Sequence, residues 1–205
     1  MGTPTFCMEC CRDQHSIVPF HRIEMWTGHF FTPAWLRQVG VVIYLGHGGK
    51  PCPESRAGEL EPGGEGECDG GQEDDEDDKD KEEEEEYSNH FEDKPPKAGQ
   101  LDENGNTIML VMDKSGVHHL PVNWCECPGC PGKEMQLLAM GLFPASFKRF
   151  HSAFTFAVLD DFLLENLECK TSAYHYVSKL ARITSPLFPD RVTVCPIFIV
   201  RGMCI

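Results

Sequence analysis

Five cysteine and histidine side chains lie close together near the start of the chain. They are spaced as Cys7-x2-Cys10-Cys11-x3-His15-x5-His21. Two thiolates and two imidazoles at such spacing can surround one tetrahedral Zn²⁺ ion. Because the two-residue gap to Cys7 favours Cys10 over Cys11, we predict a zinc site of Cys7, Cys10, His15 and His21, with Cys11 as an alternative ligand. The other interpretation makes Cys10 or Cys11 a small core side chain and His21 a strand residue.

A second group of ligand-type side chains is divided by a long acidic segment. His47 and Cys52 precede that segment, and Cys125 and Cys127 follow it. Each pair is expected on a loop that leaves a strand, where structural zinc ligands commonly lie. One ion bound by all four would join the flanks of the segment, since the entropy cost of loop closure rises slowly with length. The alternatives are two unrelated pairs, or a knuckle in which Cys130 replaces a ligand.

The cysteine count bears on compartment and on chemistry. The chain has 11 cysteines and nine histidines. No secretory signal is recognisable at the N-terminus, so metal ligation in a reducing compartment is favoured over disulfides. The apolar runs are too short for a transmembrane helix, and we expect no membrane association. No phosphate-binding loop, dinucleotide fingerprint or zinc-hydrolase helix is present, and we predict neither enzyme activity nor a small-molecule substrate.

The charge of the chain is concentrated in one segment. The sequence has 33 acidic and 18 basic residues, a formal net charge of −15. Residues 54–86 hold 18 of the acidic and three of the basic residues, so the remainder is neutral. A neutral remainder lacks the strong basic face that phosphate contacts usually leave in a DNA-binding sequence.

The elements expected before the acidic segment position the first ligands. Residues 20–26 alternate as in a strand. Thr32, followed by a proline, is typical of a helix start, and that helix is expected to run to about Val39 and end at Gly40. Residues 41–45 are a short buried strand that delivers His47 and Cys52 on a loop.

The acidic segment and the elements after it have contrasting compositions. Residues 54–105 are nearly free of apolar side chains, and we expect them to be disordered. Residues 107–113 and 117–124 then predict a β-hairpin. Helices follow: one over residues 134–142, a longer one capped by Ser152, and another capped by Ser172.

These elements predict an α+β fold in which small zinc-stabilised Cys/His-rich strands and loops precede a helical segment. The expected organisation is an N-terminal half of a zinc module (1–53), a disordered acidic insert (54–105), a C-terminal half with hairpin, Cys-x-Cys pair and helices (106–186), and a diverged tail (187–205).

Six sequence blocks occur in one order: Cys-x2-Cys-Cys, PFHRIEMWTGHFF, LGHGGKPCP, SGVHHLPVNWCEC, QLLAMGLFPASFKRFHSAFTFAVLDDF and KTSAYHYVSKLARIT. Together they resemble the second type of CxC-like cysteine-cluster domain, which is associated with KDZ (Kyakuja–Dileera–Zisupton) transposases of fungi. The resemblance spans residues 7 to about 184, interrupted by the acidic insert. It implies a zinc-chelating module that accompanies a transposase catalytic domain, and its first cluster is similar to half of a B-box.

The resemblance also implies a set of metal ligands. In mid-strand, His118 and its neighbour His119 are most simply core histidines, but the resemblance adds weight to His118 as a ligand. Family members usually carry a further Cys-x2-Cys upstream, without which the first site would be incomplete, and the acidic insert is not a family element. The implied ligands are Cys7, Cys10, Cys11, His15, His21, His47, Cys52, His118, Cys125 and Cys127.

We therefore predict a module of a KDZ-type transposable element with two structural Zn²⁺ ions and without the catalytic domain. Its expected partners are DNA or a transposase, and its expected location is the nucleus. One alternative is a protein–protein adaptor whose acidic residues 54–86 bind basic nuclear proteins. Another is a non-functional transposon fragment.

Overall fold

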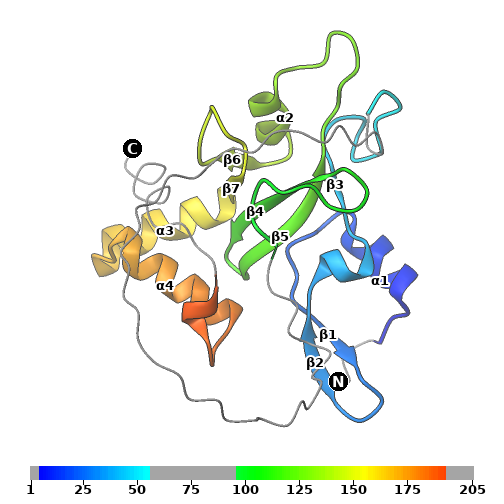
Figure 1. Cartoon of the computed structure of the whole chain (residues 1–205). Helices are drawn as coiled ribbons and strands as arrows, with labels where there is room; N and C mark the ends of the chain where they lie inside the picture. The colour runs from blue at the N-terminus through cyan, green and yellow to red at the C-terminus, as the bar shows by residue number, and fades with distance from the viewer. Residues whose placement is uncertain (1–4, 56–95, 193–205) are drawn as a thin grey trace, which may run out of the picture.

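A five-stranded mixed β-sheet forms the centre of the protein (Figure 1). A computed structural model describes residues 5–55 and 96–192. The strand order is β3-β5-β4-β7-β6, with parallel pairs β3–β5 and β4–β7 and antiparallel pairs β4–β5 and β6–β7. The strands of this sheet are β3 (Ile43–Tyr44), β4 (Thr107–Asp113), β5 (Gly116–Asn123), β6 (Leu142–Pro144) and β7 (Ser152–Thr155).

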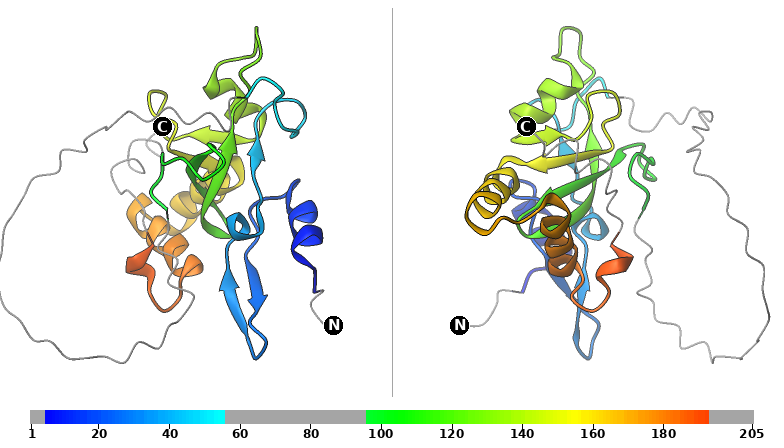
Figure 2. Two further views of the ribbon diagram at one scale, coloured as in Figure 1. Left: turned by 45° about the vertical axis from the view of Figure 1, so that its right-hand side comes forward. Right: turned by 90° about the vertical axis from the view of Figure 1, so that its left-hand side faces the viewer.

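Helices lie on both faces of this sheet, as the two turned views show (Figure 2). Helices α3 and α4 pack against one face, and α2 and the 3-10 helix η1 contribute side chains to the other. A second 3-10 helix, η2, follows α4. The helices are α1 (Met8–His15), η1 (Leu36–Val39), α2 (Lys133–Ala139), α3 (Phe156–Cys169), α4 (Ala173–Thr184) and η2 (Pro189–Arg191).

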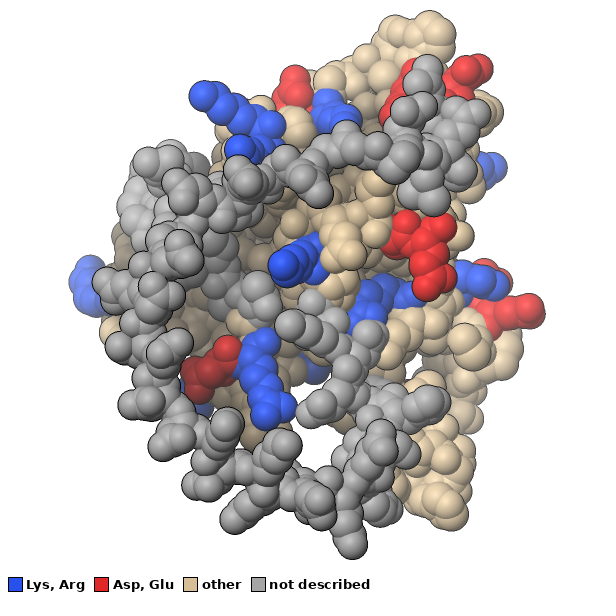
Figure 3. Space-filling view, viewed as in Figure 1, with Lys and Arg blue, Asp and Glu red and all other residues tan. Residues whose placement is uncertain are grey.

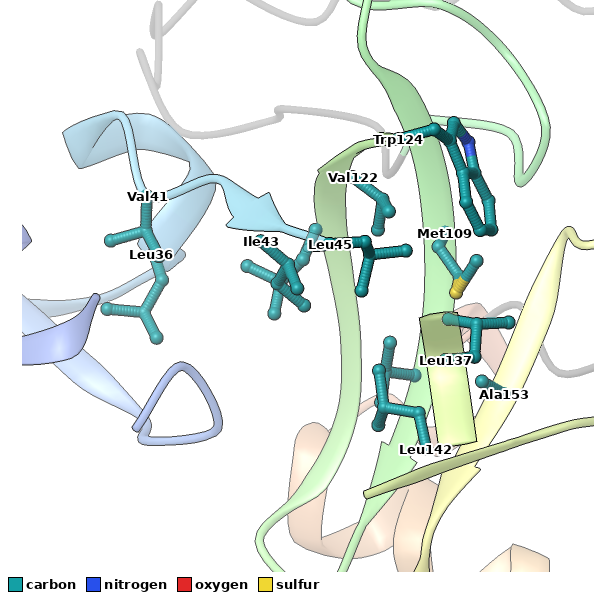
Figure 4. Packing of buried hydrophobic residues seen from close by; sticks show 12 residues of the cluster. Leu36, Val41, Ile43, Leu45, Met109, Val122, Trp124, Leu137, Leu142 and Ala153 are labelled. Carbon is teal, nitrogen blue, oxygen red and sulfur yellow. The ribbon is translucent and has the colours of Figure 1, made fainter. Parts of the chain in front are cut away.

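The two faces have separate apolar cores because successive strand residues point in opposite directions. Met109 and Val111 of β4 belong to the core shared with α2, where Leu137 lies over the strand (Figure 4). Leu110 and Met112 of the same strand pack instead with α3 and α4. A strand covered on both faces is continuously apolar, which is why residues 108–112 are all buried.

The parallel pairing of β3 with β5 has the largest consequence for function. Ile43 is paired with Val122, and Tyr44 with Asn123. Because parallel strands end at the same edge of a sheet, the loops that follow β3 and β5 leave side by side (Figure 1). Residues 46–55 and 124–132 therefore meet, although about 75 residues separate them.

A separate two-stranded ribbon projects from the body of the protein (Figure 1). It consists of β1 (Ile23–Trp26) and β2 (Phe31–Ala34), which pair antiparallel. Helix α1 lies beside η1.

The α+β fold class is confirmed, and several predicted elements are present. The hairpin of β4 and β5 is found where residues 107–113 and 117–124 predicted it. Residues 41–45 include β3, and Val41, Ile43 and Leu45 are buried. Ser172 caps α4, since its Oγ accepts a hydrogen bond from the His175 N–H at 3.3 Å.

The prediction of a helix that begins at Thr32 is wrong. Thr32 and Pro33 lie in β2, and only Leu36–Val39 forms a 3-10 turn, which ends at Gly40 as expected. Pro33 is tolerated in a strand because this ribbon has only two strands, and a proline at a free edge removes no required hydrogen bond. Pairing with β1 therefore outweighs the local helix-start signal.

The prediction that a helix begins after a cap at Ser152 is also wrong. Ser152–Thr155 is strand β7, held between β4 and β6, and Thr155 caps α3 through its Oγ1, which accepts from the Val158 N–H at 3.1 Å. The helix predicted over residues 134–142 ends earlier, at Ala139, because Gly141 adopts a φ of 75° and strand β6 follows.

The acidic insert ends earlier than residue 105. The backbone of residues 99–100 is hydrogen-bonded to Ile108, and Asp102 accepts hydrogen bonds from the backbone N–H groups of Asn104 and Asn106. The prediction of disorder concerns mainly residues 56–95, which lie outside the described residues. Of the predicted tail, residues 193–205 also lie outside them.

Candidate metal centre

The two loops that leave β3 and β5 bring four ligand-type side chains together. The ligand atoms of His47, Cys52, Cys125 and Cys127 all lie within 4.8 Å of one another. His47 Nε2 is 3.3 Å from both Cys125 Sγ and Cys127 Sγ. Cys52 Sγ is 3.9 Å from Cys125 Sγ and 3.5 Å from Cys127 Sγ. Within residues 5–55 and 96–192, this is the one group of three or more such side chains that meets this spacing.

These separations match the edges of a tetrahedral metal site. Zinc–sulfur bonds of about 2.3 Å and zinc–nitrogen bonds of about 2.0–2.1 Å imply edges of about 3.8 Å between sulfurs and about 3.6 Å between sulfur and nitrogen. Four of the six separations lie within about 0.3 Å of those values, and the other two are at most 4.8 Å. They are far longer than a disulfide bond, and all three cysteines are free. The group can therefore hold a metal ion.

The loop that carries His47 has an unusual backbone. Gly46, His47, Gly48 and Gly49 all have positive φ angles, and that of His47 is 46°. A side chain larger than glycine is uncommon in this conformation. The Gly49 N–H donates to the Gly46 carbonyl at 2.9 Å and closes the turn. The turn directs the imidazole of His47 toward the sulfurs of the other loop.

Two features favour glycine at position 46. One is its φ of 95°, and the other is its close contact with Cys125. A Cβ at this position would lie 2.8 Å from Cys125 Cβ and 3.4 Å from its Sγ. The backbone of the first loop thus packs directly against a proposed ligand from the second. Only glycine leaves room for that packing.

Gln136 of α2 fixes the second loop. This side chain is only 4% exposed. Its Oε1 accepts from the Cys125 N–H at 3.0 Å, and its Nε2 donates to the carbonyls of Cys125 at 3.0 Å and Pro131 at 2.9 Å. A buried amide that satisfies both backbone groups of one ligand holds that ligand in place.

Asn123, the last residue of β5, ties the flanks of the insert to the sheet. Its carbonyl accepts from the Leu45 N–H at 2.9 Å. Its Nδ2 donates to Ser55 Oγ at 3.0 Å and to Asn106 Oδ1 at 2.9 Å. The segments on either side of residues 56–95 are therefore both joined to the strand that leads to Cys125.

The thiols of the group are unequal in acidity. Burial raises the pKa of Cys52, but hydrogen bonds from the backbone N–H groups of Glu126 and Glu54 lower it more, to about 6. Its hydrogen bond with Cys52, together with burial, raises the pKa of Cys127 to about 12. Cys52 is therefore the more acidic of these two thiols, and thiolate is the form that binds metals.

Cys130 lies beside this group but outside it. Its Sγ donates to the Cys125 carbonyl at 3.1 Å. Its backbone N–H donates to the Cys127 carbonyl at 3.0 Å, so residues 127–130 form a tight turn. The knuckle that would make Cys130 a ligand is present as a turn, but the four-membered group is complete without it.

The structure does not bring the first predicted set together in the same way. Cys7 caps α1, where its Sγ accepts from the Cys10 N–H at 3.4 Å. His15 Nδ1 lies 2.7 Å from the Cys11 carbonyl and 3.7 Å from Cys11 Sγ, and the ring of His21 is 5.2 Å from that of His15. These side chains are neighbours in pairs. A zinc ion bound by them stays a prediction.

His118 lies apart from the four-membered group. Its Nε2 is 2.9 Å from Ser115 Oγ, and Phe20 packs edge-on against its ring. His118 and His119 are both buried, at 4% and 6% exposed, because both faces of β5 are covered. Burial lowers the pKa of each to about 4, so both are neutral at pH 7. These surroundings are those of core histidines.

The supporting residues of the site were not predicted from the sequence. Gly46 and Gln136 touch Cys125, and Asn123 holds the adjacent backbone. A signal for Gln136 exists in hindsight, since a polar residue between Met135 and Leu137 of a short apolar helix needs a buried partner. No comparable signal marks Asn123.

Comparison with known proteins agrees with the resemblance seen in the sequence. Residues 90–187 match the model of a family described as a CxC2 like cysteine cluster associated with KDZ transposases. The recognition is thus confirmed over this stretch, which contains Cys125 and Cys127, while His47 and Cys52 precede it. Searches among curated proteins and among solved structures found no match. None of the described helices is both long and apolar enough to cross a membrane.

Proposed function

We propose that the protein is a zinc-stabilised accessory module of a KDZ-type transposable element, and that it is not itself an enzyme. The observation that carries the proposal is the four-membered group of His47, Cys52, Cys125 and Cys127, whose ligand atoms lie within 4.8 Å of one another. Three cysteines and one histidine form a ligand set typical of structural zinc. Four protein ligands leave no open coordination position for substrate, which supports a structural role.

Zinc fits this group better than other common ions. Thiolates disfavour magnesium and calcium, which take oxygen ligands, and three thiolates with one imidazole are a ligand set typical of zinc. Three thiolates and one Zn²⁺ add a net charge of −1. The described residues include 13 basic and 14 acidic side chains, so the folded part stays nearly neutral with the ion bound.

The proposed ion would link the two flanks of the acidic insert. The backbone pairing that holds this segment is short, since β3 has only two residue pairs with β5. Val41, Ile43 and Leu45 add apolar contacts. Metal-binding free energy adds directly to folding free energy when the site exists only in the fold. We therefore expect zinc to hold residues 41–55 against β5.

A second zinc ion at Cys7, Cys10, His15 and His21 is part of the proposal, with Cys11 as an alternative ligand. His15 and His21 are already in ring contact. The four ligand side chains would have to move closer to one another when the ion binds.

The zinc part is tested by native mass spectrometry of the full chain purified without added chelator. One or two zinc ions per chain are expected. Addition of EDTA should remove them and lower the midpoint of thermal unfolding. Fewer than one zinc per chain would overturn the proposal.

The partner of the module is proposed to be DNA or the transposase of the element, in the nucleus. On the face shown in Figure 3, Lys and Arg side chains are scattered and Asp and Glu side chains lie among them. Together with the nearly equal numbers of basic and acidic side chains among the described residues, this mixed face supports weak phosphate contacts at most, so the transposase is the stronger candidate.

Titration of labelled duplex DNA at several salt concentrations separates these partners. Binding that weakens steeply with salt would support phosphate contacts, and no binding at low salt would exclude the DNA role. The same titration with histones, using the full chain and a chain lacking residues 56–86, tests the adaptor alternative. Histone binding that depends on that segment would favour it.

A further inference from the structure

A fourth thiol, that of Cys130, lies next to the proposed zinc ligands and has no part in the four-membered group. Cys130 is three residues beyond Cys127, with Pro128 and Gly129 between them. Its Sγ donates to the Cys125 carbonyl at 3.1 Å, so the thiol is held at the ligand loop. The position of this thiol suggests a chemical role besides metal binding.

The backbone between Cys127 and Cys130 has the geometry that a disulfide needs. The hydrogen bond from the Cys130 N–H to the Cys127 carbonyl is 3.0 Å long, and Gly129 has a φ of 81°. Such a β-turn brings its end Cα atoms within about 7 Å, and disulfides span about 4.4–6.8 Å. The two sulfurs can therefore be joined without unfolding of the loop.

Cys127 and Cys130 are the more accessible thiols of the site. Cys52 and Cys125 are each 8% exposed, whereas Cys127 and Cys130 are half-buried. Both of these line a shallow hollow of about 460 Å³ between the two ligand loops, beside Gly48 and Met140. A small oxidant can reach Cys127 from this hollow without displacing the core.

We propose that Cys127 and Cys130 form a thiol-oxidation site that controls the metal centre, with hydrogen peroxide as co-reactant. This inference rests on the proposed zinc function. As a metal ligand Cys127 would be a thiolate. Its sulfur attacks one oxygen of hydrogen peroxide and becomes a sulfenic acid, and the other oxygen leaves as water. The Cys130 sulfur then attacks Cys127, displaces the hydroxyl as a second water, and forms the disulfide. Two thiols are oxidised and one peroxide is reduced.

Formation of this disulfide removes one of the four ligands. His47, Cys52 and Cys125 remain, and a three-ligand site binds zinc more weakly. Cys130 is suited to this step because it carries no metal and is free to attack. Cys125 is less suited, since Gly46 packs on its Cβ and Gln136 holds its backbone.

The test uses the zinc-loaded full chain, hydrogen peroxide and a chromogenic zinc chelator. Release of zinc is expected together with a Cys127–Cys130 disulfide, located by peptide mass spectrometry after alkylation of free thiols. Dithiothreitol should restore zinc binding. In Cys130→Ser, zinc should bind normally, but reversible release should slow by about tenfold or more because the proposed resolving thiol is absent. Cys169→Ser, which changes an exposed cysteine at the end of α3, should behave as the wild type.

Three results would overturn the inference. These are a disulfide that joins Cys52 to Cys127, release from Cys130→Ser at the wild-type rate, and loss of zinc from Cys130→Ser before oxidation. The last would make Cys130 a ligand. Peptide mapping of the wild type keeps the test valid if Cys130→Ser folds poorly. Absence of zinc from the untreated wild type would instead refute the proposed function.

Discussion

The two groups of cysteine and histidine side chains are opposites in sequence and in structure. The first group lies within residues 7–21, and its members meet only in pairs. The second group is divided between residues 47–52 and 125–127, and all four of its ligand atoms lie within 4.8 Å of one another. The group that is compact in sequence is dispersed in space, and the group that is dispersed in sequence is compact.

The difference lies in what supports each group. The second is carried by loops that leave neighbouring parallel strands, and Asn123, Gln136 and Gly46 hold those loops. The first is carried by α1 and the chain that follows it, and Cys7 and Cys10 are exposed. The sheet edge and these supporting residues hold the ligands of the second group close to one another. Ligands on a surface helix need the metal, or further chain, to assemble them.

The largest expected effect is the loss of zinc and of stability when a ligand of the second group is replaced. Replacing one ligand in each group tests the difference between the two groups directly. Cys125→Ser should lower the zinc content by one ion, measured by native mass spectrometry. It should also lower the free energy of unfolding by about 4 kcal/mol when zinc is a thousandfold above its Kd. Cys10→Ser should leave that ion in place. A loss of the sheet-edge zinc from Cys10→Ser, with Cys125→Ser unaffected, would reverse the ranking of the two sites.

Two glycines of one loop give the next test. Gly46→Ala should destabilise the protein by about 3 kcal/mol, because it adds a 2.8 Å contact with Cys125 Cβ to the strain of positive φ. Gly48→Ala shares the positive φ but meets no atom within 4 Å, and should cost about 1 kcal/mol. Chemical denaturation of the zinc-loaded variants measures both. If both variants lost the same unfolding free energy, the close contact between Gly46 and Cys125 would not support the site.

A smaller effect is expected from the side chain that holds the Cys125 backbone. Gln136→Leu should weaken zinc binding by about tenfold to a hundredfold, because the N–H and carbonyl of a ligand lose their partner. Competition with a chelator of known affinity measures the change. Gln100→Leu, at an exposed position, is the matched control. An unchanged affinity in Gln136→Leu would limit that residue to a role in packing.

The four ligands of the site could be predicted from their residue types. The strand pairing that brings them together could not. Alternating apolar residues predicted the hairpin of β4 and β5, and the types of His47, Cys52, Cys125 and Cys127 predicted a shared ion. Their meeting depends on the parallel pairing of β3 with β5, which spans the insert and has no local signal. The same limit explains the error at Ser152, where pairing of β7 with β4 and β6 outweighs a helix-cap pattern.

The last expected effect concerns the sheet that carries the second group, and it appears only in acid. Burial, with Arg37 nearby, lowers the pKa of His119 to about 4 from an ordinary 6.5. Below pH 6.5 the unfolded chain binds a proton that the folded chain does not take up until about pH 4. Stability is therefore complete above pH 6.5 and is lost as the pH falls from 6.5 toward 4, by up to about 1.4 kcal/mol per pH unit. His119→Gln has no such proton, so its unfolding free energy should fall less between pH 6.5 and 4.5. Because acid weakens zinc binding equally in both proteins, the difference between their profiles isolates His119, and parallel profiles would mean that this histidine titrates normally in the fold.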